Sequence, residues 1–184
     1  MARSDLAFAR ARRAYERAHV MSGLRGIALA AALTALAIGL HRTSNLTWLV
    51  SALLAATLGA LSWRGGSWRR GALAGIFAGL PVFVAPVVVF ALGHGGHCPD
   101  CPMPTMQCLL TCFTTSSLAG IAVGTFAFGD ASPPRFAAGA LATAVCTGLL
   151  GCATTGLGGA LGVAIGLVAG SATGWALGRR AAHA

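Results

Sequence analysis

Residues Gly156 to Leu177 read GLGGALGVAIGLVAGSATGWAL, a run without a single charged side chain. A helix of this length rises about 33 Å at about 1.5 Å per residue, enough to cross the roughly 30 Å hydrocarbon core of a bilayer. Unpaired backbone groups are costly in hydrocarbon, and the run is too long and continuous for an alternating strand. It therefore predicts a transmembrane helix.

Apolar runs of similar length recur along the rest of the chain. Of its 184 residues 56% are hydrophobic and 9% charged, and the mean hydropathy of +0.76 leaves too little polar surface for a soluble globule. We predict an all-α, polytopic transmembrane bundle of about six spans. Four or five spans are the alternatives, because the fifth run is short and its outer boundary is soft. The preceding runs are Val20 to Leu40, Leu46 to Trp63, Gly71 to Leu92, Leu109 to Phe128 and Phe136 to Cys152.

The arginines predict the orientation of these spans. The chain has 13 Arg and Lys residues together, all of them Arg, and a net charge of +9. With the N-terminus in the cytoplasm, every arginine except Arg42 falls on the cytoplasmic side, as the positive-inside rule requires. We therefore expect both termini in the cytoplasm, a bacterial inner membrane as location, and the lipid bilayer rather than nucleic acid as the partner of the positive charge.

This orientation divides the chain into three parts. Residues 1–19 form a cytoplasmic basic arm, residues 20–178 the six-span membrane domain, and residues 179–184 a cytoplasmic tail. The arm reads as a short amphipathic helix on the membrane surface, or alternatively as a docking segment for a soluble partner. Its candidate contacts with lipid or with a cytoplasmic partner are Arg10, Arg12, Arg13 and Arg17.

Glycines recur at every fourth position in two of the runs. Small residues at this spacing let helix backbones approach closely, and the row drifts around the helix by about 40° per step. We expect them to serve packing within the chain or between copies in a homo-oligomer. The candidate packing residues are Gly71, Gly75 and Gly79 in the third run and Gly158, Gly162, Gly166, Gly170 and Gly174 in the last.

The cysteines gather toward the outer side. The stretch HGGHCPDCPMPTMQCLLTC begins at His94, and the outer loop is expected at residues 93–108. Counting along the fifth run at about 1.5 Å per residue puts its two cysteines in the outer half of the membrane and at its outer boundary. The candidate metal or redox residues are Cys98, Cys101, Cys108, Cys112, Cys146, Cys152, His94 and His97.

Three chemistries are compatible with this set. Disulfides are the first, because thiols in an oxidising compartment pair readily. A soft or borderline metal ion, zinc or copper, is the second: Cys98 and Cys101 have CxxC spacing, with two histidines nearby. Thiol exchange is the third, because Cys98-Pro99-Asp100-Cys101 is similar to the CPxC motif of thioredoxin-like proteins.

The layout also resembles the six-helix bacterial inner-membrane anti-sigma factors of the sigma-F negative-regulator type. The resemblance is carried by the Arg-rich start, by Pro133-Pro134-Arg135 leading into GALA at Gly139 to Ala142, by the outer cysteines and by Leu177-Gly178-Arg179-Arg180. It implies that the cysteines sense metals or oxidants and that the arm holds a cytoplasmic sigma factor.

These features favour an integral membrane regulator or sensor whose outer cysteines respond to metal or oxidant. The alternatives are a small metal-binding or metal-transport membrane protein and a membrane thiol-disulfide oxidoreductase. We expect a non-enzymatic role, because the sequence has four acidic residues and no recognisable catalytic triad.

Overall fold

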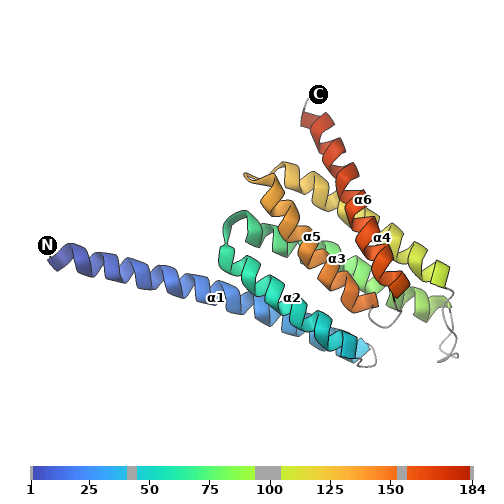
Figure 1. The fold of residues 1–184 in the computed structure, drawn as a ribbon, viewed down its shortest axis with the longest axis horizontal. Coiled ribbons are helices and arrows are strands. Elements are labelled where there is room, and N and C mark those ends of the chain that lie inside the picture. Colours follow the sequence, from blue (N-terminus) through green and yellow to red (C-terminus); the bar gives the residue numbers. More distant parts are fainter. Residues whose placement is uncertain (1, 41–44, 94–104, 153–156, 183–184) are drawn as a thin grey trace.

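The computed structural model describes residues 2–40, 45–93, 105–152 and 157–182, and in these ranges it contains helices and no strands (Figure 1). Each apolar run of the sequence lies in or largely in one helix. The helices are α1 (Ala2–Leu40), α2 (Asn45–Arg64), α3 (Gly66–Gly93), α4 (Thr105–Phe128), α5 (Pro133–Cys152) and α6 (Leu157–Ala182).

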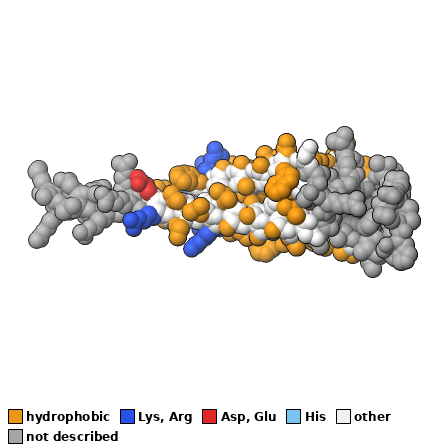
Figure 2. Space-filling model, turned by 90° about the horizontal axis from the view of Figure 1, so that it is seen from below, with side chains coloured by type: hydrophobic (Ala, Val, Ile, Leu, Met, Phe, Trp, Pro, Cys, Tyr) orange, Lys and Arg blue, Asp and Glu red, His pale blue; other side chains and the backbone are white. Residues whose placement is uncertain are grey.

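Among the described residues, four helices are long and apolar enough to cross a membrane. The candidate spans are Tyr15–Gly39, Asn45–Arg64, Leu109–Phe128 and Gly159–Ala181, in α1, α2, α4 and α6. Large apolar side chains also cover the outside of the bundle: Phe77, Leu118 and Phe126 are each about 70% exposed. Figure 2 shows this apolar surface, with charged side chains at the end from which α1 projects. The all-helical, multi-pass prediction is thus confirmed for four helices.

The arm and the first span form one helix. The sequence predicted a separate short helix for residues 2–19, whereas α1 runs unbroken from Ala2 to Leu40. The physical reason is composition: Ala and Arg are strong helix formers, and no glycine or proline occurs before Gly23. At about 1.5 Å per residue α1 is about 58 Å long, and it extends well beyond the other helices (Figure 1).

The tightest helix pair is α4 with α6, which run parallel. A contact recurs every four residues, between one row of residues on α4 and a facing row on α6. At Gly162, Gly166, Gly170 and Gly174 a Cβ atom would come within 3 Å of the α4 backbone, and at Gly120 and Gly124 it would meet the α6 backbone equally closely. The facing positions are Cys112 with Gly162, Ser116 with Gly166, Gly120 with Gly170, Gly124 with Gly174, and Phe128 with Gly178.

The second pair, α3 with α5, is built in the same way. Gly71, Gly75 and Gly79 of α3 lie so close to α5 that an added Cβ would overlap the α5 backbone or a threonine side chain. In return Gly139 lies against α3 near Gly71, and Gly151 lies against the backbone of Phe83. The facing positions are Gly71 with Gly139, Gly75 with Thr143, Gly79 with Thr147, and Phe83 with Gly151.

Helix α1 packs along α2, which makes a third main helix pair. A hydrogen bond crosses each of the three pairs. The Ser22 hydroxyl donates to the Ser62 carbonyl at 3.1 Å, the Thr143 hydroxyl to the Ala72 carbonyl at 3.0 Å, and the Ser116 hydroxyl to the Gly162 carbonyl at 3.2 Å. Backbones that approach closely bring these carbonyls within reach of a short side chain. The glycines and the hydroxyl groups therefore act together.

Two short turns shape one end of the bundle. Between α2 and α3, Gly65 and Gly66 have φ of 67° and 53°, a conformation that glycine adopts without strain. Between α4 and α5, the Asp130 carboxylate accepts from the Ser132 amide at 2.9 Å and pairs with Arg70 at 3.2 Å. We call this end the arginine-rich end; its helix termini carry Arg64, Arg69, Arg70, Arg135, Arg179 and Arg180.

Candidate functional site at the cysteine-bearing end

The candidate metal or redox residues belong to the end opposite the arginine-rich end. The α4–α5 turn lies at the arginine-rich end, so the beginning of α4 and the end of α5 lie at the other one (Figure 1). We call it the cysteine-bearing end. Four of the predicted site residues lie outside the described residues: His94, His97, Cys98 and Cys101.

Cys108 and Cys152 are placed by their backbone. Cys108 lies in the first turns of α4, and Cys152 is the last residue of α5. Cys108 stands four residues before Cys112 in the sequence. The side chains of these two residues are not among those described.

Cys112 is a core residue. Its side chain is fully buried, and it packs with Val82, Val163 and Leu167 in one hydrophobic cluster. Its Cβ lies 3.3 Å from the position that a Cβ of Gly162 would occupy. Cys112 is thus the first of the α4 residues in the facing positions described above, about 10 Å from the start of α4.

Cys146 lies in a different cluster. It is 5% exposed and packs among α1, α2 and α3 side chains that include Leu54, Ile76 and Phe83. A hydrogen bond joins its thiol to the Thr57 hydroxyl of α2. Cys146 therefore faces α2, on the other side of α5 from Ala144, which belongs to the cluster of Cys112.

The structure does not join these two cysteines. Both carry thiols rather than a disulfide, and they belong to separate core clusters. Within the described ranges no group of three or more His, Cys, Asp or Glu side chains is placed to hold a metal ion. A water-borne oxidant or metal could reach Cys112 or Cys146 only if the helices around them separated.

The structure describes more of the predicted packing glycines than of the predicted cysteines and histidines. Seven of the eight candidates lie at a close helix contact, and Gly158 lies in α6 with surroundings outside the described side chains. Sequence reasoning missed their partners. Ser116, Gly120 and Gly124 also follow a four-residue spacing, which was the available signal. The missed packing glycines include Gly26, Gly120, Gly124, Gly139 and Gly151.

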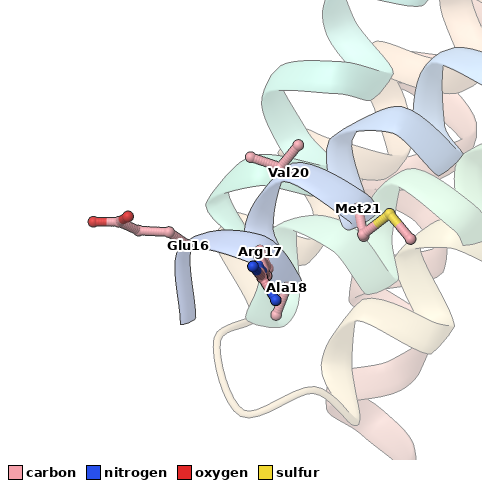
Figure 3. A pocket seen from close by; sticks show the side chains of 5 residues that line it. All are labelled: Glu16, Arg17, Ala18, Val20 and Met21. Carbon is pink, nitrogen blue, oxygen red and sulfur yellow. The ribbon is translucent and has the colours of Figure 1, made fainter. Parts of the chain in front are cut away.

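The arm residues belong to the projecting part of α1. Arg10, Arg12 and Arg13 lie on this helix, outside the described side chains, and Arg17 is exposed. Arg17 lines an open hollow of about 730 Å³ together with Glu16, Ala18, Val20 and Met21 (Figure 3). The arginines are therefore carried by the helix that also crosses the apolar part of the bundle.

Comparison of the chain with protein-family models, with curated proteins and with solved structures gave no significant match. The resemblance to membrane anti-sigma factors therefore stays a prediction from sequence.

Proposed function

We propose that this chain is a six-span regulator of a bacterial inner membrane, with both termini in the cytoplasm, whose outer cysteines control what the N-terminal arm binds. The observation that carries the proposal is the unbroken helix α1, Ala2–Leu40. A displacement at the Leu40 end is passed along a helix of about 58 Å to the arginines of the arm. No loop intervenes to absorb it.

The packing of α1 supports a movement of this kind. Helix α1 packs mainly along α2 and only slightly on α5. By contrast, one glycine row joins α3 to α5 and another joins α4 to α6. The α1–α2 contact is held by Gly26, which lies against Leu58 and Ser62, and by the hydrogen bond from Ser22 to Ser62. We infer that α1 and α2 shift as a unit against the remaining four helices.

In this proposal the input is a disulfide, or a zinc or copper ion, at Cys98 and Cys101 in the segment between α3 and α4. The output is the positively charged arm, which suits an acidic surface on a soluble protein. The resemblance to anti-sigma factors suggests a sigma factor as that protein. No contact among the described residues favours a metal transporter or a thiol oxidoreductase over a regulator.

The test measures the distance between the arm and the bundle in the full-length protein in lipid nanodiscs. Spin labels are attached through unnatural amino acids at Ala14 in α1 and Arg135 in α5, so that the native cysteines are kept. Oxidant or zinc should shift the distance distribution in the wild type. The C98S/C101S variant should show no shift.

A cellular experiment tests the output. Replacing Arg10, Arg12, Arg13 and Arg17 by Gln should change gene expression as deletion of the whole gene does. Replacing Arg179 and Arg180 at the end of α6 by Gln is the matched control and should leave expression unchanged. An unchanged distance in every redox and metal state, or normal expression without the arm arginines, would refute the proposed function.

A further inference from the structure

A hollow lies between the entry of α1 into the bundle and the end of α2. Its volume is about 630 Å³, and it is open on one side. We call it the α1–α2 hollow. It is lined by Tyr15, Glu16, His19 and Val20 of α1 and by Trp63 and Arg64 of α2.

The hollow lies where the candidate span of α2 ends, at Arg64, and beside the apolar part of α1. Beyond Val20, the exposed side chains of α1 are mostly apolar, as at Met21 and Leu24, and Arg25 is the charged exception before Leu29. Tyrosine and tryptophan are enriched at the level of lipid head groups. The polar part of the hollow is thus at head-group level, and its apolar part continues into the hydrocarbon level.

Arg64 is the main donor at this hollow. Its guanidinium lies 5.4 Å from the ring centre of Trp68, which fixes one face of the planar group. The N–H groups at its edge are still able to bind two oxygens of one phosphate. Stacking that leaves the edge exposed is a suitable arrangement for binding an anion at a membrane surface.

The His19 ring lies near two aromatic rings. Its ring centre is 4.1 Å from that of Tyr15 and 6.3 Å from that of Trp63. Nδ1 lies 3.1 Å from the Tyr15 carbonyl oxygen, so this nitrogen donates to the backbone. In this tautomer Nε2 is an acceptor, so it is left for a hydroxyl of a ligand. The Glu16 carboxylate is directed away from the bundle (Figure 3).

We propose that the α1–α2 hollow binds an anionic phospholipid, with Arg64 donating to its phosphate, His19 Nε2 accepting from a hydroxyl of its head group and Val20 beside the start of an acyl chain. A free phosphate compound offers the same polar group but nothing for the apolar wall. This inference goes beyond the proposed function: it needs neither the cysteines nor a soluble partner, only that α1 and α2 cross a bilayer.

The test is lipid binding by the full-length protein in detergent, followed by native mass spectrometry. The probes are phosphatidylglycerol, phosphatidylcholine and, in separate samples, millimolar inorganic phosphate or glycerol phosphate as competitors. Arg64→Gln should weaken phosphatidylglycerol binding roughly tenfold, because it removes a charge-assisted hydrogen-bond donor. His19→Gln is a second variant and should weaken binding several-fold.

Arg179→Gln is the matched control. Arg179 also belongs to the arginine-rich end and lies 5.9 Å from the ring centre of Trp175, but it does not line the hollow. The control should change the affinity less than twofold, and soluble phosphate should not displace the lipid. Equal losses in Arg64→Gln and Arg179→Gln would overturn the site in favour of general surface charge. Displacement by soluble phosphate would overturn the assignment to a lipid.

Discussion

Replacing Gly170 by Ala tests the parallel packing of α4 and α6. A Cβ at Gly170 would overlap the Ser117 carbonyl oxygen and lie 2.8 Å from its carbon, whereas ordinary contact begins at 3.4 Å. The α4 backbone must therefore retreat by at least 0.6 Å, the difference of these two values, and further to clear the carbonyl oxygen. Because a backbone cannot rotate aside as a side chain can, the neighbouring contacts along the row loosen as well. Overpacking of this kind costs about 1–3 kcal/mol.

Gly39→Ala is the matched control. Gly39 lies in α1 and has nothing within 4 Å of an added Cβ. Both variants gain up to about 1 kcal/mol of helix propensity, so the difference between them isolates the contact. We expect the free energy of unfolding to be about 2 kcal/mol lower in Gly170→Ala than in Gly39→Ala. The assay is unfolding in mixed bicelles with increasing SDS, followed by circular dichroism. Equal stabilities in the two variants would show that α4 and α6 do not approach at Gly170.

Three further outcomes are expected. Thr143→Val removes a hydroxyl that lies 3.0 Å from the Ala72 carbonyl of α3 and 2.9 Å from the Gly139 carbonyl of its own helix, and it should lower the free energy of unfolding by about 1 kcal/mol in the same assay; an unchanged value contradicts the contact with α3. Hydrogen bonds from Ser67 and Ser132, together with Arg70, hold the pKa of Asp130 below its ordinary 3.8. Asp130→Asn should therefore lower the Tm by a constant amount at neutral pH, and the difference should close only as the pH falls through that depressed pKa. Cys112 and Cys146 should resist a membrane-permeant maleimide until SDS unfolds the bundle, as mass spectrometry would show; rapid labelling of the native protein would place them at a surface.

The apolar runs predicted the helices because the length of a hydrophobic segment is read directly from the sequence. They did not predict where each helix begins. Helix α3 starts at Gly66 rather than Gly71, since the intervening Ser67, Trp68, Arg69 and Arg70 are polar or amphipathic but compatible with a helix. In α1 the same effect merged the basic arm with the first span. A change from apolar to charged residues marks the expected edge of the membrane, and a helix does not have to end there.

The glycine rows were visible in the sequence, but their partners were not. A four-residue row wraps around its helix and is compatible with several neighbours, so Gly162 to Gly174 did not identify α4. The partner became evident only when Gly120 and Gly124 were seen to face that row in register. The cysteines show a similar gap. Counting residues along the helices predicted that Cys112 and Cys146 lie at a similar depth in the membrane. Their side chains point in different directions around their helices, so they belong to separate core clusters.

The parallel pairing of α4 with α6 has a consequence for biosynthesis. Helix α4 leaves the ribosome well before α6, and α5 lies between them in the chain. Until α6 is inserted, the α4 surface at Gly120 and Gly124 faces lipid or a temporary neighbour. The final described helix is thus the one that closes the bundle. A nascent chain halted before Leu157 keeps α3 paired with α5 but leaves α4 without its matching row on α6.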